Sequence, residues 1–332
     1  MKKVTSRMVA AHAGVSQSTV SKAINNNPEI PAETRRRVIR AGRELGYPLI
    51  PRHGRRTIAI VIPSFTGFEG YVGGMLSTLT RELYRRGMRQ ELIPGDDLAL
   101  LDERCIDGGV SIDWRPELCR LWAELLPSPL VRINSRSDHA ANCYSIVFDG
   151  EQAVENLVAR LWRLGHRRIG FFFMDSRRHE DANVARRLPG FLAAVERRGV
   201  PRGLDFCEFD CLFRTPEELA EILARWRKAG VTALIGANEI GNALMYRAAS
   251  LLGLRIPQDL SVVGWEFPYV SQFLNPPLST LALDRETICR EVVDLLERLL
   301  RKETVTADLH LPFHYEERES VAPPGQPPVS GS

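Results

Sequence analysis

The sequence lacks the features of membrane, secreted and disulfide-stapled proteins. No segment approaches the roughly 18 consecutive apolar residues that mark a membrane span. The opening residues, MKKVTSRMVAAHAGVS, turn polar where a signal peptide needs an unbroken apolar run. The six cysteines show no CxxC spacing, in a chain too large to need covalent staples. We therefore expect a cytoplasmic protein with no membrane partner and with reduced cysteines, mostly packed in its core.

Signatures of catalysis and of bound cofactors are also missing. The chain contains no GxSxG elbow, no P-loop, no GxGxxG after a strand and no HExxH motif. His310 and His314 would share one face of a strand, but a proline stands between them and no third ligand accompanies them. We expect no enzyme, no catalytic residue, no cofactor and no metal site.

What the chain does have is an ordinary globular composition with an uneven distribution of charge. With 44% hydrophobic and 26% charged residues, it can bury a core large enough for one small domain and one two-lobed domain. Residues 1–56 hold twelve Lys/Arg and three Asp/Glu, a net charge of +9. The whole chain has 44 Lys/Arg and 41 Asp/Glu, so the remaining residues hold 32 Lys/Arg and 38 Asp/Glu, a net charge of −6. This asymmetry indicates that the first segment meets a polyanion, although a basic, solvated helix face would give the same charge.

Residues 1–47 show the pattern of a helix-turn-helix domain. Apolar residues at helical spacing predict helices at about 6–13 and 17–24, and a third between Pro31 and Gly46. Gly14 permits the left-handed conformation of the turn between the first two. Thr5 and Ser16 stand at the N-cap positions. Three short helices with a tight turn between the first two make a helix-turn-helix.

The second of these helices carries side chains that suit the reading of DNA. In such a domain its first turns lie at the base edges, so Gln17, Ser18 and Lys22 are the predicted base-reading residues. Other short polar or basic side chains suit the DNA backbone: Thr5, Ser16, Thr19, Ser21, Asn25, Thr34, Arg55 and Arg56. A plain three-helix bundle with solvated polar residues fits the same pattern.

A longer string decides between these readings. The run VTSRMVAAHAGVSQSTVSKAINNNPEIPAETRRRVIRAGRELGY, with AGVSxxTVSxxxN as its core, resembles the DNA-binding headpiece of the LacI/GalR family of bacterial regulators. Met8 departs from the usual Asp. The resemblance implies a transcription regulator that binds double-stranded operator DNA as a homodimer, with repression as the default expectation and activation as the alternative.

The linker at residues 48–57, PLIPRHGRRT, departs from the family pattern. Family members carry a hinge helix resembling PNxxARxL that wedges into the minor groove, whereas this linker is about six residues shorter. Pro48, Pro51 and Gly54 oppose a regular helix there. The linker arginines, Arg55 and Arg56 among them, could instead form a basic arm along the DNA, or could be unspecific surface charge.

Residues 58–319 alternate short β-rich runs with amphipathic helices. TIAIVIP, GGVSI, LVRIN, YSIVFD, RRIGFFFM, TALIGAN and SVVGWE read as buried strands. Repeated βα units predict an α/β fold with doubly wound parallel sheets and ligands at the carboxyl ends of the strands. The Pro/Gly/Ser-rich residues 320–332 are expected to be a disordered tail without a function.

This second region also resembles the family, with lower identity, in segments such as LGHRRIGF and GLRIPQDLSVVGWE. The resemblance implies a periplasmic-binding-protein-like domain of two lobes, with crossovers near 148–151, 278–282 and 303–306. Its cleft would bind a small-molecule effector, a sugar or related metabolite, and its surface would form the homodimer. Cleft closure would then change the spacing of the two headpieces.

Candidate effector-binding residues follow from the resemblance and from strand ends. Arg187 matches the family arginine that grips effector hydroxyls or carboxylates, Asn238 matches the Asn of the family's AND segment, and Glu266 stands where the family has Asp. Further candidates follow the predicted strands: Phe65, Phe68, Asn134, Arg136 and Phe213. Taken singly, such charges are more often surface ion pairs and such aromatics more often core. Because Glu266 and Glu239 replace aspartates, the effector's identity cannot be carried over.

One rival interpretation stays open beside the regulator. The chain could be a cytoplasmic small-molecule-binding protein of the solute-binding type, with a degenerate DNA-binding role. The predicted lobes suit it equally well. The attached headpiece and the missing signal peptide argue against it.

Overall fold

The computed structural model describes most of the chain in two compact units. The described residues are 4–25, 27–47, 49, 55–63, 70–135, 142–172, 182–200, 203–208, 214–236, 239, 241–305 and 308–325. One unit comprises Met1–Phe68, Val72–Val147 and Arg285–Leu309, and the other Glu69–Tyr71, Phe148–Asp284 and His310–Ser332. The long crossings follow residues 147, 284 and 309, so the last two lie a few residues later than the resemblance implied.

The headpiece, residues 4–47, is a three-helix domain within the first unit. Its helices are α1 (Ser6–Ala13), α2 (Gln17–Ile24) and α3 (Ala32–Leu45). Gly14 adopts a left-handed φ of 64°, which lets the chain turn between α1 and α2, and the Ser16 hydroxyl accepts the Thr19 N–H at 3.0 Å. Thr5 is the N-cap of α1, but its side chain makes no capping hydrogen bond. The predicted helices are confirmed here.

The N-terminal lobe, which makes up the rest of the first unit, is a six-stranded sheet in the order β11-β5-β4-β3-β1-β2. Its strands are β1 (Thr57–Ile62), β2 (Arg89–Pro94), β3 (Gly108–Ser111), β4 (Leu130–Ile133), β5 (Cys143–Phe148) and β11 (Asp308–Leu311). Its helices are α4 (Gly70–Arg85), α5 (Leu118–Leu125) and α10 (Arg285–Leu300), with a 3-10 turn η1 (Leu98–Glu103). The pairings among β1 to β5 are parallel, as predicted.

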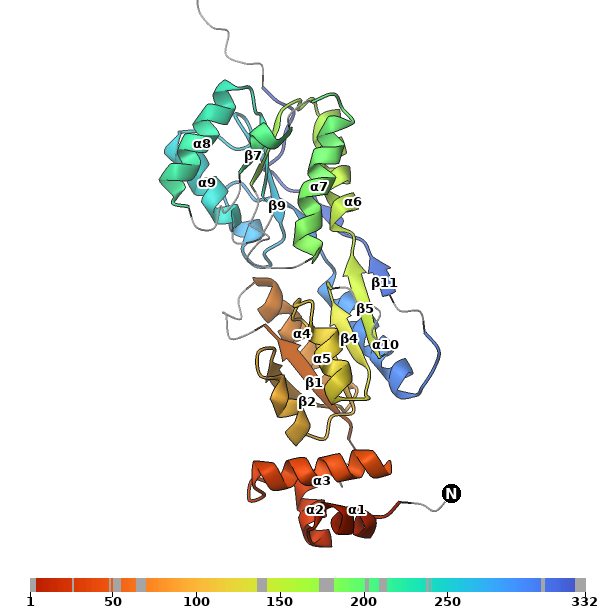
Figure 1. The fold of residues 1–332 in the computed structure, drawn as a ribbon. Helices are drawn as coiled ribbons and strands as arrows, with labels where there is room; N and C mark the ends of the chain where they lie inside the picture. Colours follow the sequence, from red (N-terminus) through yellow and green to blue (C-terminus); the bar gives the residue numbers. More distant parts are fainter. Residues whose placement is uncertain are drawn as a thin grey trace, which may run out of the picture. The chain divides into compact units, whose positions relative to one another are not determined.

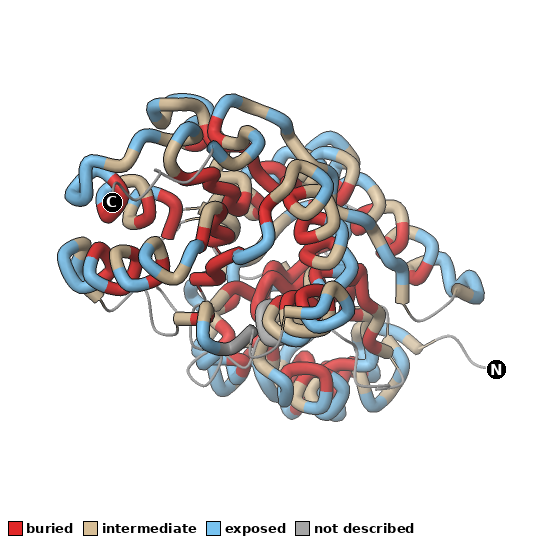
Figure 2. The backbone as a smooth tube through the Cα atoms, turned by 90° about the horizontal axis from the view of Figure 1, so that it is seen from above, coloured by how far each residue is buried: buried red, intermediate tan, exposed pale blue. Residues whose placement is uncertain are grey.

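Burial explains why these runs become central strands. Every residue of β1 is buried, because helices cover both faces of a parallel sheet and each side chain then faces a core. Trp122 of α5 fills one of those cores and is fully buried, with its indole N–H donated to the Ser128 carbonyl oxygen at 2.8 Å. In Figure 2 the buried residues accordingly run along the strands and the inward faces of the helices.

The C-terminal lobe is the second unit and repeats this architecture. Its sheet has the order β12-β10-β9-β8-β6-β7, with only the β10–β12 pair antiparallel among the described pairings. The strands are β6 (Ile169–Phe172), β7 (Cys207–Glu208), β8 (Ala233–Gly236), β9 (Ser261–Trp265), β10 (Ser279–Ala282) and β12 (His314–Glu316). The helices are α6 (Gly150–Arg163), α7 (Ala182–Glu196), α8 (Pro216–Lys228) and α9 (Gly241–Leu251), as Figure 1 shows.

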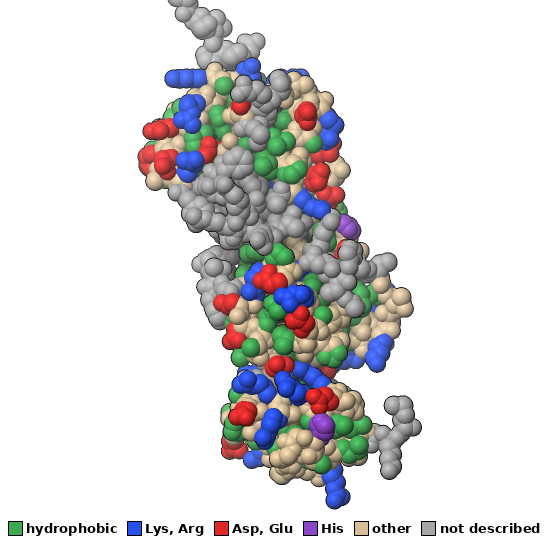
Figure 3. Space-filling view, in the orientation of Figure 1, with side chains coloured by type: hydrophobic (Ala, Val, Ile, Leu, Met, Phe, Trp, Pro, Cys, Tyr) green, Lys and Arg blue, Asp and Glu red, His purple; other side chains and the backbone are tan. Residues whose placement is uncertain are grey.

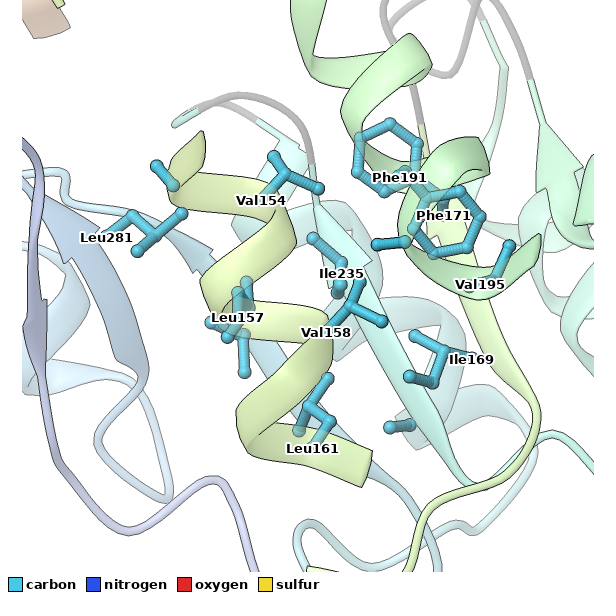
Figure 4. Close-up of a cluster of buried hydrophobic side chains, with 14 of the residues drawn as sticks. Val154, Leu157, Val158, Leu161, Ile169, Phe171, Phe191, Val195, Ile235 and Leu281 are labelled. Atoms are coloured by element: carbon cyan, nitrogen blue, oxygen red, sulfur yellow. The ribbon is translucent and has the colours of Figure 1, made fainter. Parts of the chain in front are cut away.

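Apolar residues at helical spacing on α6 form part of the core of this lobe. Val154, Leu157, Val158 and Leu161 recur every three or four residues along α6, so they lie on one face of the helix. Figure 4 shows that face turned toward β6 and α7. There the Phe171 ring stacks on Phe191, with centroids 4.7 Å apart. The predicted α/β fold with doubly wound parallel sheets is confirmed.

The predicted boundary of the C-terminal tail is wrong. The expected tail does not begin at residue 320. The Ser320 hydroxyl is buried, accepts the Ser279 N–H at 2.8 Å and donates to the Val262 carbonyl oxygen at 2.6 Å. Composition suggested disorder, but these hydrogen bonds fix the segment to the sheet.

The remaining general expectations concern cysteines, metals and membranes. Cys105, Cys119, Cys143, Cys207 and Cys289 are free and buried, as predicted for reduced core residues. Within the described ranges, no three His, Cys, Asp or Glu side chains gather as metal ligands would. Among those same ranges, no helix combines the length and apolarity that crossing a membrane requires.

Candidate DNA-reading surface and effector site

Helix α2 separates a buried face from an exposed one. Val20, Ala23 and Ile24 are buried against the other headpiece helices. Gln17, Ser18 and Lys22, the predicted base-reading residues, are exposed. Because Ser18 and Lys22 are four residues apart, they lie one above the other on the same face. The fold therefore presents all three side chains at the surface of one helix.

Each of these three side chains has a nearby polar partner. The Gln17 amide donates to the Ser6 hydroxyl at 2.8 Å, the Ser18 and Ser16 hydroxyls are 2.8 Å apart, and Lys22 Nζ lies 3.0 Å from a Glu29 carboxylate oxygen. All three contacts are exposed, so water competes with them and each stabilises the domain only weakly. Nucleic-acid groups of the same polarity could replace them.

The predicted backbone-contacting residues divide into two groups. Ser16 and Asn25 already serve the helix, since Ser16 caps α2 and the Asn25 amide donates to the Ser21 carbonyl oxygen at 2.7 Å. The others carry no such capping bond in the headpiece, and they are exposed or half-buried: Thr5, Thr19, Ser21, Thr34, Arg55 and Arg56. Figure 3 shows Lys and Arg side chains over the headpiece and along its border with the N-terminal lobe. This charge suits a polyanion.

Only part of the predicted effector site is described by the structure. Five candidates lie outside the described residues: Phe65, Phe68, Arg136, Phe213 and Asn238. The other three, Asn134, Arg187 and Glu266, are described. Arg187 and Glu266 belong to the C-terminal lobe, and Asn134 belongs to the N-terminal lobe.

In the C-terminal lobe, Arg187 and Glu266 lie around one tryptophan. Arg187 is only 7% exposed, and its guanidinium carbon lies 4.1 Å from the centroid of the Trp265 ring. Trp265 is the last residue of β9, so Glu266 follows directly at the carboxyl end of that strand. The structure thus brings the two predicted residues to the strand edge where α/β folds bind ligands.

Glu266 has partners that local sequence signals could not identify. Arg318 donates to its carboxylate at 2.8 Å, and the Thr280 hydroxyl also donates to that carboxylate. Arg318 further donates to the Thr280 hydroxyl at 3.0 Å and to the Leu278 carbonyl oxygen at 2.6 Å. Glu266 is thus held in a half-buried ion pair, and the pair fixes the orientation of its carboxylate.

In the N-terminal lobe, the carboxyl ends of β3 and β4 carry a polar cluster. Asn134 follows β4 with a φ of 63°, and its N–H donates to the Ile146 carbonyl oxygen at 2.7 Å. Beside it in the fold, buried Arg132 donates to the Arg115 carbonyl oxygen at 2.8 Å, and Arg115 Nε donates to buried Asp113 at 3.1 Å. Sequence reasoning missed Asp113, although it directly follows the predicted GGVSI strand.

The headpiece and the C-terminal lobe each match a known family model. Residues 7–48 match bacterial regulatory proteins of the lacI family, and residues 158–321 match the periplasmic binding protein-like domain. Among curated relatives, catabolite control protein A of Priestia megaterium is 26% identical over 96% of this chain and 99% of that protein. The HTH-type transcriptional repressor CytR of Escherichia coli is 27% identical over 88% of each chain.

Solved structures agree in fold. A CelR–cellobiose complex is 26% identical, with a TM-score of 0.66, and covers 96% of this chain and 99% of that one. The lac repressor dimer bound to operator is 22% identical, with a TM-score of 0.66, and covers 97% of this chain and 100% of that one. Taken with the helix-turn-helix and the two parallel-sheet lobes, these matches show that the chain belongs to the LacI family of bacterial transcription regulators.

Proposed function

We propose that the chain is a homodimeric repressor whose operator affinity is controlled by a small-molecule effector. Gln17, Ser18 and Lys22 read base edges, while the surrounding short polar and basic side chains hold the DNA backbone. The observation that carries this proposal is the exposure of these three side chains on one helix whose opposite face is buried. Such a regulator acts where bacterial DNA lies, in the cytoplasm.

A homodimer follows from the small reading surface. One headpiece offers too few base contacts for tight and specific binding, so two headpieces on a pseudo-palindromic operator are needed. We expect a partner subunit to cover large apolar side chains that the lobes expose: Tyr84, Tyr269 and Phe273 are 76%, 81% and 76% exposed. The lac repressor relative was solved as a dimer on its operator.

The effector is proposed to be a sugar or related metabolite held at the strand ends of the lobes. Arg187 would grip its hydroxyl or carboxylate groups, and Trp265 would give an apolar face beside the arginine. Solved relatives carry cellobiose, ribose and lactose. We assign this site to binding without a chemical reaction, because the relatives named above are regulators.

The proposal is tested by selecting DNA from a random pool with the purified full chain and then screening metabolites for release of that DNA. We expect one palindromic sequence to be enriched, and one class of sugar or sugar acid to weaken its binding. Enrichment of no sequence would contradict the operator function. Enrichment without any effective metabolite among sugars, sugar acids and nucleosides would contradict the effector class alone.

A further inference from the structure

The third headpiece helix is joined to the N-terminal lobe by one arginine. Arg43 lies near the end of α3, and its guanidinium donates across 3.2 to 3.4 Å to four acceptors. All four belong to the lobe: the carbonyl oxygens of Leu101, Arg104 and Leu125 and the carboxylate of Asp102. A guanidinium is a planar group with five N–H donors, so it can bind several acceptors of a folded surface at once.

An apolar contact accompanies this arginine. Cys105 follows η1 in the lobe, is 3% exposed, and belongs to the same cluster as the headpiece core residues Val38 and Ile39. Leu49, beyond the end of α3, packs against the same cluster and lies against Gly42, where a Cβ atom would collide with it. The headpiece and the lobe therefore share one core around Cys105.

This contact between headpiece and lobe through Arg43 and Cys105, which we call the dock, suits both the arginine and the DNA-reading helix. Burial lowers the pKa of the Arg43 guanidinium, and the Asp102 carboxylate opposes that shift, so the cation depends on its lobe acceptors for stability. Gln17, Ser18 and Lys22 remain exposed while α3 is docked. A docked headpiece can therefore still face DNA.

We propose that Arg43 is a positioning residue: it fixes the headpiece on the N-terminal lobe, so that the lobe itself sets where the recognition helix is held. This task would otherwise need a hinge helix, and the residues 48–57 lack the PNxxARxL pattern for one. Movement of the lobe would then reach α2 through packed contacts. The inference rests on the proposed operator function, since positioning matters only if α2 reads DNA.

Alkylation of Cys105 by N-ethylmaleimide, followed on the full chain by mass spectrometry, reports the dock without any DNA. Burial raises the pKa of the Cys105 thiol to about 12, so the docked thiol should react slowly. In Arg43→Ala we expect Cys105 to react about tenfold faster, because the contact that covers it opens more often. Cys119 and Cys143 in the lobe core should keep their rates.

Arg40→Ala is the matched control, because it removes the same charge from an exposed position of the same helix. It should leave the Cys105 rate unchanged. If Arg43→Ala does not fold, Asp102→Asn weakens the same contact from the lobe side and should raise the rate less. An unchanged Cys105 rate in every folded variant of this pair would overturn the dock.

A second readout separates positioning from mere stability. On DNA selected from a random pool, with half-sites moved apart or together one base pair at a time, the wild-type chain should prefer one spacing sharply. Arg43→Ala should bind a broader range of spacings, with less affinity at the preferred one. A faster Cys105 reaction with an unchanged spacing preference would overturn the positioning role. If no DNA is selected at all, the operator function fails while the alkylation result still decides the dock.

Discussion

The headpiece and the C-terminal lobe place their candidate functional side chains in opposite ways. In the headpiece, Gln17, Ser18 and Lys22 are neighbours in sequence, exposed, and held only by weak surface contacts. In the C-terminal lobe, Arg187 and Glu266 are far apart in sequence, and each is packed or ion-paired within the fold. A DNA-reading surface can be built by one helix, whereas a ligand site needs the tertiary fold to bring distant residues together.

The largest effect should come from breaking the reading surface. The double variant Gln17→Ala with Lys22→Ala should weaken binding to the selected operator by about 2 to 6 kcal/mol, since each base contact contributes about 1 to 3 kcal/mol. Random DNA should be affected only through the lost lysine charge. Fluorescence anisotropy at fixed salt measures both. Lys228→Ala, which removes one charge from the C-terminal lobe, is the control; an equal loss on both DNAs would remove the base-reading role.

A smaller effect is expected at the ligand site. Arg187→Ala should weaken effector binding about tenfold to a hundredfold, because a charge-assisted hydrogen bond contributes about 1.5 to 3 kcal/mol. Operator binding without effector should not change. Titration calorimetry against the metabolite found by the release screen measures the first quantity. Arg186→Ala, the neighbouring arginine on α7, is the control, and equal affinity in both variants would take Arg187 out of the site.

The next effect in size should come from acidification, which should destabilise the C-terminal lobe. His166 is buried in the C-terminal lobe, where its ring nitrogens contact the Thr232 hydroxyl at 2.8 Å and the Ala322 carbonyl oxygen at 3.0 Å. Burial lowers its pKa below the ordinary 6.5. As the pH falls below about 6.5, the unfolded chain takes up this proton first, so the stability present at higher pH is progressively lost.

Urea unfolding of the C-terminal lobe, measured between about pH 7.5 and about pH 5.5, checks this prediction. The free energy of unfolding should decrease as the pH is lowered in the wild type, and it should decrease less in His166→Gln. His12→Gln changes an exposed headpiece histidine that pairs with Glu44, and it should keep the wild-type slope. Equal slopes in all three chains would show that His166 does not carry the effect.

The smallest effect should come from the exposed pair on the reading surface. Glu29→Gln frees Lys22 from its partner and removes a negative charge near the proposed reading surface. Operator affinity should rise by no more than about 1 kcal/mol, because exposed ion pairs are weak. Anisotropy titrations against the same operator measure it, with Glu33→Gln on α3 as control. A weaker complex for Glu29→Gln would mean that the pair helps to place Lys22.

Local signals were enough to predict the headpiece. Gly14 and Ser16 mark the turn by their own chemistry, and the buried positions of α2 follow helical spacing, so the predicted boundaries agree with the structure. The parallel sheets could be predicted for a similar reason, because runs such as IAIVI (residues 58–62) are apolar at every position.

Other features depend on contacts between distant segments. Nothing near Glu266 in sequence points to Arg318, and nothing in the Pro/Gly-rich end points to the bonds by which Ser320 joins two strands. The same holds for Arg43, whose acceptors lie 58 to 82 residues away.

The most direct test measures the affinity of the full chain for its selected operator and for a scrambled DNA of the same length, at the same salt concentration. A sequence-reading dimer should bind the operator at least about a thousandfold more tightly than the scrambled DNA. Equal affinity for the two would contradict the central claim, because it would leave the headpiece with charge alone.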